Sequence, residues 1–212
     1  MTSFKMKRHL FLIFVLVFSL NASSQPKTKF DGKNWEAPYI LDIPKGWDVE
    51  RFLIPIEFAP VINYKGVEDI RFTPGWGKKE TNDYWSYAFL WYLDSTINFD
   101  SKTFESNLTA YYTGLININV DKTKLTDKLV PVEVSVKERS VEKDDAKTFE
   151  GTVSMSDFLT QKPIKLNLLI HVKYCEGPGK TLIFHELSPK PYSDKVWTGL
   201  DQLWTDFKCR KE

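Results

Sequence analysis

Residues 164–187 read IKLNLLIHVKYCEGPGKTLIFHEL, and this stretch decides the fold more than any other part of the chain. From Leu166 to Tyr174 every second residue is apolar, which is the period of a strand with one buried face. The segment Glu176–Lys180 is rich in glycine and proline and predicts a tight turn. A turn this short joins antiparallel neighbours, so we expect a hairpin of residues 164–175 and 180–187.

The same alternation extends outward from this hairpin. Residues 130–137 and 148–155 alternate between apolar and polar side chains, and residues 67–74 and 84–94 precede them as two further strands joined by a polar turn. The connections between the last four strands are too short for parallel crossovers. A mostly antiparallel sheet of about six strands is therefore expected.

Two segments follow the period of a helix instead. Residues 101–118 place Phe104, Leu108 and Tyr112 on one side, with Asp100 or Ser101 as the N-cap. Near the C-terminus, Val196, Leu200 and Leu203 share one side of a second helix, capped by Ser193 or Asp194. The chain thus predicts an α+β fold in which both helices pack on one face of the sheet, a two-layer sandwich.

The remaining segments divide the chain into three parts. Residues 1–24 are a predicted signal peptide, residues 25–66 an irregular Pro- and Gly-rich segment that wraps the domain, and residues 67–212 a single α+β domain. Frequent prolines exclude a long helix from the wrapping segment, where we expect a short helical turn around residues 47–53.

The N-terminus has the order of an export signal. Lys5, Lys7 and Arg8 precede the apolar run 10–20, and small residues follow at 22–24. The apolar run is shorter than the roughly 20 residues that span a bilayer. We expect cleavage and a periplasmic or extracellular protein with no membrane span after cleavage; the alternative is an uncleaved anchor.

Export also bears on the two cysteines. Disulfides persist outside the cytoplasm, so Cys175, at the end of a strand, and Cys209, at the end of the last helix, are expected to form a disulfide. The alternative is two free thiols.

Composition and motifs exclude several functions. Lys and Arg number 29 against 28 Asp and Glu, and this balance gives no surface for nucleic acid. The chain contains none of the nucleotide-binding, serine-hydrolase or zinc-protease motifs, so we assign no catalytic residue, no metal ligand and no cofactor.

One pair of side chains deserves a separate hypothesis. If the hairpin turns about Pro178, His171 faces His185 on the more polar face of the sheet, close enough to share a divalent metal. A shift of one residue in register removes the pairing, and two imidazoles without a shared ligand are the alternative.

Three segments carry a resemblance to known sequences. Gly66–Trp76, Tyr84–Tyr92 and Phe184–Pro191 resemble segments of an uncharacterised family of secreted bacterial proteins. The family has no known function, so the resemblance implies export from a bacterium and assigns no active residue.

Aromatic residues, at 15% of the chain, indicate a candidate binding region. Trp76 lies in a glycine-flanked loop, Trp85 and Tyr87 begin the following strand, and Arg71 lies on the preceding strand. We predict that these four residues border a ligand site, with the rings contacting the ligand and Arg71 orienting an anionic or hydroxyl group. Alternatively, Trp76 covers the core as a plug and residues 84–94 are a central strand buried on both sides.

Two functions from different classes remain. The first is an exported binding or interaction module with a small apolar or glycan ligand, or a protein partner. The second is a small periplasmic hydrolase with an unrecognised active site. The missing catalytic motifs favour the first, and a pocket with converging polar groups would favour the second.

Overall fold

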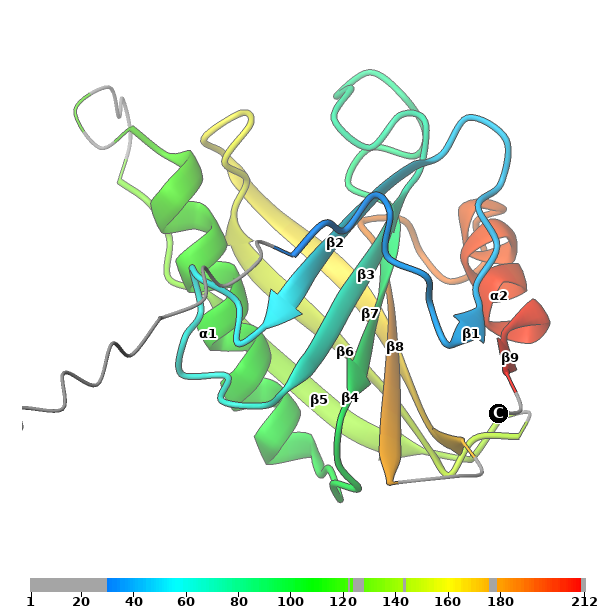
Figure 1. Ribbon diagram of the computed structural model, residues 1–212. Coiled ribbons are helices and arrows are strands. Elements are labelled where there is room, and N and C mark those ends of the chain that lie inside the picture. Colours follow the sequence, from blue (N-terminus) through cyan, green and yellow to red (C-terminus); the bar gives the residue numbers. More distant parts are fainter. Residues whose placement is uncertain (1–29, 122, 124–127, 143, 176–178, 211–212) are drawn as a thin grey trace, which may run out of the picture.

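A seven-stranded antiparallel sheet forms the centre of the protein, seen in the computed structural model of Figure 1. The structure describes residues 30–121, 123, 128–142, 144–175 and 179–210, so the predicted signal peptide lies outside the described residues. In spatial order the strands are β2 (Asp48–Ile54), β3 (Gly66–Phe72), β4 (Tyr87–Leu93), β8 (Lys180–Ser188), β7 (Pro163–Cys175), β6 (Lys147–Ser156) and β5 (Glu133–Arg139). The predicted α+β class and the mostly antiparallel sheet are confirmed.

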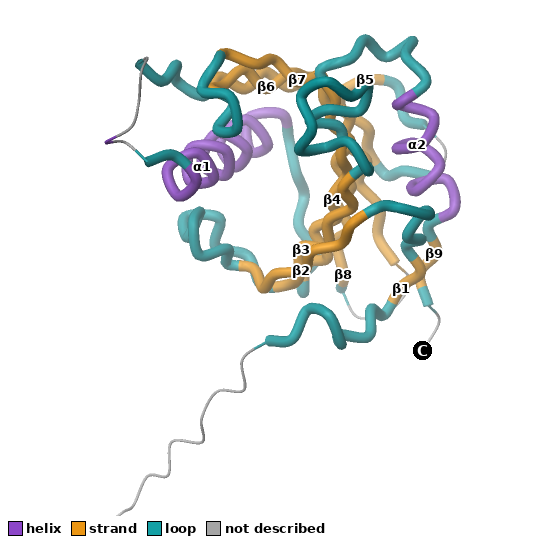
Figure 2. Tube along the Cα trace, turned by 90° about the horizontal axis from the view of Figure 1, so that it is seen from above, coloured by secondary structure: helices purple, strands orange, loops and turns teal. Residues whose placement is uncertain are grey.

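The two helices lie on opposite faces of this sheet, so the expectation that both cover one face is wrong. Helix α1 (Ser101–Asn119) joins a core with Phe89, Trp91 and Ile170, and we call that side the inner face. Helix α2 (Val196–Asp206) joins a separate core with Leu90 and Phe184 on the outer face. Figure 2 shows the sheet curved around α1, with α2 on the other side.

The reason for two covered faces is visible in β4. Tyr87, Phe89 and Trp91 point to the inner face, whereas Ala88 and Leu90 point to the outer face, and all five are buried. The strand lies between β3 and β8 in the middle of the sheet. A strand that is apolar on both sides must be covered on both sides, and one helix covers only one of them.

The helical turn expected around residues 47–53 is wrong, because these residues form strand β2 instead. Asp48–Ile54 pairs with β3 over its whole length, from Asp48 opposite Phe72 to Ile54 opposite Gly66. Backbone pairing with a neighbouring strand outweighs the weak local preference of this short segment. The segment 25–66 therefore supplies the edge strand of the main sheet.

The hairpin of β7 and β8 has a register one residue away from the expected one. His171 lies opposite Phe184, and His185 lies opposite Ile170. Since successive side chains alternate between faces, a shift of one residue sends the two histidines to opposite sides of the sheet. His171 faces outward and His185 inward, so they cannot share a metal ion.

A second, small sheet fastens the C-terminus to the N-terminal segment. Strand β1 (Tyr39–Ile40) pairs with β9 (Lys208–Cys209), and the predicted disulfide between Cys175 and Cys209 is confirmed, with Cα atoms 5.8 Å apart. The disulfide connects the end of β7 to the strand that follows α2. Among the described residues, no helix combines the length and apolarity needed to cross a bilayer.

Candidate functional site

A large groove opens on the inner face between α1 and the strands β2, β3 and β4. Its volume is about 1580 Å³, above the usual 300–1,000 Å³ of small-molecule pockets. Helix α1 packs mainly on β5 and β6 and reaches β4 with the ring of Tyr111, and the groove opens between this helix and the edge strand β2. We call this feature the aromatic groove because rings from four separate segments line it: Phe52, Phe58, Phe72, Trp76, Trp85, Tyr87, Tyr111 and Phe158.

Three of the four predicted site residues lie in this groove. Trp76 is half-buried and its ring lies 4.6 Å from Phe72 and 5.5 Å from Trp85, measured between centroids. Trp85 and Tyr87 are buried and form the floor behind it. Trp76 therefore both borders the groove and packs on the inner core, which combines the two expectations for this residue.

The loop that carries Trp76 is held at both ends by backbone hydrogen bonds. The amide of Trp76 donates to the carbonyl of Thr73 at 3.0 Å, and the carbonyl of Trp76 accepts from the amide of Trp85 at 3.0 Å. The side chain of Asp83 accepts from the amide of Gly75 at 2.8 Å. The ring of Trp76 is thus placed by its own loop and needs no ligand to hold it.

Trp85 has a backbone conformation that is rare for a bulky residue. Its φ is 53°, in the left-handed region. The cost is offset by the side chain, because the indole Nε1 donates to Oδ1 of Asp157 at 3.0 Å. Strained residues of this kind gather at functional sites, where the rest of the structure holds them in place.

The polar atoms of the groove's floor are bonded away from the groove. The hydroxyl groups of Tyr87 and Tyr112 lie 2.5 Å apart in a mutual hydrogen bond, and the Tyr111 hydroxyl donates to Oε1 of Glu68 at 2.7 Å. Together with the Trp85–Asp157 bond, these contacts leave ring carbon as the surface that the floor presents.

Apolar side chains also stand exposed around the mouth of the groove. Phe52 is 39% exposed, Leu159 44% and Ile118 63%, and all three line the groove from different elements. A single exposed apolar residue is ordinary, but several around one hollow mark a binding surface.

One end of the groove is closed where the chain before β3 touches α1. A Cβ atom placed on Gly114 would lie 1.9 Å from the carbonyl oxygen of Phe58, so only glycine permits this approach. The glycine that weakens the helix in the sequence has this packing role in the structure. It brings the Phe58 ring within 5.1 Å of Tyr111, centroid to centroid.

Arg71, the fourth predicted residue, does not belong to the aromatic groove. It lies opposite Ala88 on β4 and therefore points to the outer face, away from Trp85 and Tyr87. The prediction placed Arg71 at the same end of the sheet as Trp85 and Tyr87. It did not show that Arg71 lies on the opposite face from these two rings. Alternation along β3 and β4 decides that point.

Asp48, Glu50 and Glu57 line the groove, whereas Glu68 lies behind its rings and is closed off from ligand. Its Oε2 accepts from Nε1 of Trp91 at 2.8 Å while Oε1 is bonded to Tyr111, and the side chain has no exposed surface. Burial raises the pKa of Glu68 to about 7. The group can stabilise the wall of the groove, but in this arrangement it cannot reach a substrate.

The outer face contains a second buried titratable cluster around His171. Its Nδ1 lies 2.7 Å from Oδ2 of Asp145, and its Nε2 lies 3.4 Å from Oε1 of Glu186. Burial lowers the pKa of His171, but the two carboxylates outweigh it and raise the value to about 9. Asp145 also accepts from Nε1 of Trp204 on α2 at 2.8 Å, so the cluster fastens that helix to the sheet.

Both histidines lie away from the groove. His171 and His185 have no exposed surface and line neither hollow described here. Within the described part of the chain, no group of three His, Cys, Asp or Glu side chains is arranged to hold a metal ion.

Sequence reasoning missed several groove residues. Phe52 and Phe58 belong to the segment 25–66, which was predicted to be irregular, and Phe158 lies in no predicted element. The periodicity of the sequence therefore did not indicate that these rings converge. The density of aromatic residues before residue 60 was the available hint. In the comparisons with known proteins, no family model matches this chain, and no curated protein matches its sequence.

Proposed function

We propose that this protein is an exported binding module whose aromatic groove holds the apolar chain of an elongated amphiphile. The observation that carries the proposal is the inward bonding of the floor's polar atoms, which leaves a floor of ring carbon under a rim that also carries the charged side chains of Glu50 and Lys78. Burying apolar area at about 25 cal/mol per Å² supplies the affinity for such a chain.

The same observation separates an apolar chain from the other ligands considered. Sugar hydroxyl groups or a peptide backbone pressed against the floor of this groove would lose hydrogen bonds to water, because Tyr87, Tyr111 and Trp85 have already used theirs. An unpaired buried polar group costs about 1–3 kcal/mol. An unbranched hydrocarbon chain meets no such cost.

Quenching of tryptophan fluorescence by 8-bromooctan-1-ol tests the proposal. The bromine quenches an indole in contact with it, and Trp76 lines the groove. We expect saturable quenching, with the quenched fraction reduced in Trp76→Phe. Maltoheptaose, offered as a glycan, is expected to leave the spectrum unchanged.

Rim variants connect binding to the groove. Phe52→Lys and Ile118→Lys place a charge on exposed positions of the rim, so folding is preserved while affinity falls about tenfold. Val141→Lys is the matched control, because Val141 is 54% exposed and does not line the groove. Equal quenching in the rim variants and the control would contradict the proposal.

The exported location rests on the signal sequence at residues 1–24, and the disulfide is compatible with it. N-terminal sequencing of the mature protein is expected to begin near residues 22–25. A soluble cytoplasmic pool that retains Met1 would contradict export.

A further inference from the structure

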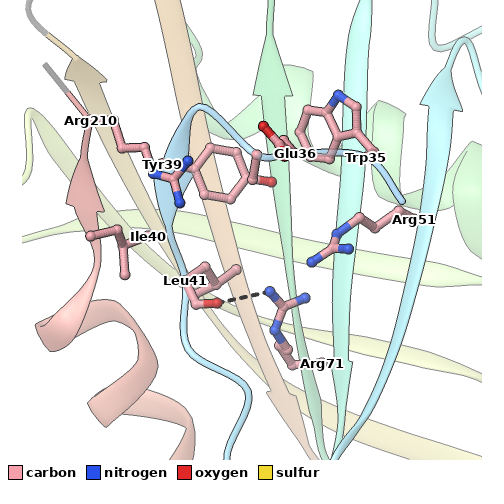
Figure 3. A pocket seen from close by; sticks show the side chains of 9 residues that line it. Trp35, Glu36, Tyr39, Ile40, Leu41, Arg51, Arg71 and Arg210 are labelled. Atoms are coloured by element: carbon pink, nitrogen blue, oxygen red, sulfur yellow. Dashed lines mark hydrogen bonds between the residues drawn. The ribbon is translucent and has the colours of Figure 1, made fainter. Parts of the chain in front are cut away.

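A second hollow lies on the outer face, and it has a different chemistry from the aromatic groove. It encloses about 420 Å³ and is lined by three arginines, Arg51 of β2, Arg71 of β3 and Arg210 after β9, together with the rings of Trp35 and Tyr39. We call it the arginine pocket. Figure 3 shows the three guanidinium groups entering from separate elements around Tyr39.

Arg71 forms the fixed base of this pocket. Its Nε donates to the carbonyl of Asp42 and its Nη2 to the carbonyl of Leu41, both at 3.0 Å, while Nη1 and Nη2 also reach the carboxylate of Asp69. With a further bond from Nη1 to the carbonyl of Ile70, the guanidinium donors are used internally. Arg71 therefore positions its neighbours and has no donor left for a ligand.

The carboxylate of Asp69 is also fully engaged. Besides Arg71 it accepts from Nε of Arg51 at 3.0 Å and from the Tyr39 hydroxyl at 2.9 Å, and it has no exposed surface. One buried carboxylate thus serves two guanidinium groups. The cluster of Arg51, Arg71 and Asp69 therefore carries a net charge of one positive unit.

Arg51 and Arg210 supply the donors that remain. Arg51 uses Nε on Asp69 and Nη1 on the carbonyl of Gly32, and among the described residues no acceptor bonds its Nη2. The side chain of Arg210 likewise has no bonded acceptor in the described part of the chain. Glu36 also lines the pocket, and both Glu36 and Arg210 are exposed. The three arginines outnumber the two carboxylates of Asp69 and Glu36.

We propose that the arginine pocket binds the oxyanion of a small organic acid between Arg51 and Arg210. Guanidinium groups match the planar, bidentate geometry of carboxylate and phosphate oxygens. The hollow is larger than a bare ion requires, and Trp35, Tyr39 and Leu41 offer apolar surface for the rest of the molecule. Arg51 lines both this pocket and the aromatic groove, but the remaining lining of the pocket differs, and the proposal does not depend on the function proposed for the groove.

The disulfide determines where Arg210 stands. Cys209 is bonded to Cys175, and the amide of Arg210 donates to the carbonyl of Pro38 at 3.3 Å, next to the small sheet. Loss of the disulfide releases β9, which directly precedes Arg210, so reduction is expected to weaken the binding of the anion.

An NMR titration with benzoate tests the site, with the indole signal of Trp35 as the local reporter. We expect saturable shifts of Trp35 and of the Arg51 Nε–H signal, and weaker binding as NaCl screens the charges. Phenyl phosphate is expected to bind as well. Benzyl alcohol has the same ring without charge and is expected to bind at least about tenfold more weakly.

Two variants locate the oxyanion. Arg210→Gln is expected to reduce benzoate affinity about tenfold. The affinity of Arg210→Lys is expected to lie between those of Arg210→Gln and the native protein, because lysine keeps the charge but lacks the bidentate guanidinium. Lys208→Gln removes the same charge from an exposed position two residues away and is expected to change affinity less than twofold. Val141→Lys adds a charge at an exposed position that lines neither hollow and is expected to leave benzoate binding unchanged.

The proposal is overturned if benzoate and benzyl alcohol bind equally, or if Arg210→Gln and Lys208→Gln have the same effect. It is also overturned if benzoate moves the Trp76 indole signal and leaves that of Trp35 in place, because the anion would then occupy the groove.

Discussion

Trp85 donates its indole N–H to Oδ1 of Asp157 at 3.0 Å, and this bond joins the floor of the aromatic groove to the turn between β6 and β7. Asp157 also accepts from the Tyr84 hydroxyl at 2.5 Å and from the amide of Leu159 at 2.8 Å. The carboxylate is 3% exposed, so these bonds are formed away from water. One end of the groove is therefore assembled around a single side chain.

Replacing Asp157 with alanine is expected to lower the free energy of unfolding by about 2–4 kcal/mol. The variant leaves the buried indole N–H of Trp85 without an acceptor, and bonds to a charged acceptor contribute about 1.5–3 kcal/mol each. Asp157→Asn keeps one acceptor oxygen and is expected to lose less. Urea denaturation measures both, with the exposed Asp144→Ala as control. A loss no larger than that of the control would contradict this role.

Trp76→Ala separates the two roles of this ring. Trp76 is half-buried and contacts Phe72, Trp85 and Phe158, so its removal is expected to cost about 2–3 kcal/mol of stability. It is also expected to weaken the binding of 8-bromooctan-1-ol, measured through the remaining tryptophans or by calorimetry. A strong fall in melting temperature with unchanged binding would show that Trp76 only packs on the core and does not contact the ligand.

The two buried histidines are expected to give opposite dependences of stability on pH. The folded pKa of His171 is raised to about 9, above its unfolded value, so its contribution is complete below about pH 6.5 and is lost as the pH rises toward 9. Burial lowers the folded pKa of His185 to about 3, so the protein loses stability as the pH falls from about 6.5 toward 3.

NMR titration of the imidazole signals checks each pKa, and thermal unfolding across pH checks the stabilities. In His171→Gln the carboxylates of Asp145 and Glu186 lose their positive partner, and we expect a loss of about 3–5 kcal/mol at neutral pH. In His185→Phe the acid side of the profile is expected to flatten. An imidazole of His171 that titrates near 6.5 would contradict the buried ion cluster.

Removal of the disulfide is expected to destabilise the fold by about 3–4 kcal/mol. Cys175 and Cys209 are 34 residues apart, and the chain-entropy estimate for a loop of that length gives this range. The double variant Cys175→Ser, Cys209→Ser and the reduced native protein are expected to unfold at the same urea concentration. Labelling of two free thiols in the denatured, unreduced protein would contradict the bond.

The sequence by itself determined both helices and most strands of the main sheet, with their approximate limits, but not β2 or the small sheet. Alternation predicted β7 and β8, and the helical period predicted α1 from its Asp100 cap. Two cysteines in a chain with a predicted export signal led to the expected Cys175–Cys209 bond. These features depend on neighbours a few residues apart, or on a pairing with one possible partner. Trp76, Trp85 and Tyr87 were brought to one candidate site by the same local reasoning, because a single loop and the strand after it carry all three.

Only the tertiary structure decided how these elements face one another. The hairpin register differs by one residue from the symmetric choice, and that residue separates His171 from His185 and sets the face of every side chain along the pair. Helix α2 could have met either face of the sheet by its own pattern, but the outer face, with Leu90 and Phe184, was the one that α1 left uncovered. Arg71, Arg51 and Arg210 come from three distant parts of the chain, and the small sheet and the disulfide bring them together. Such contacts depend on the pairing of distant strands and on which apolar face of the sheet is still exposed. The hydrophobic periodicity of a single segment contains neither piece of information.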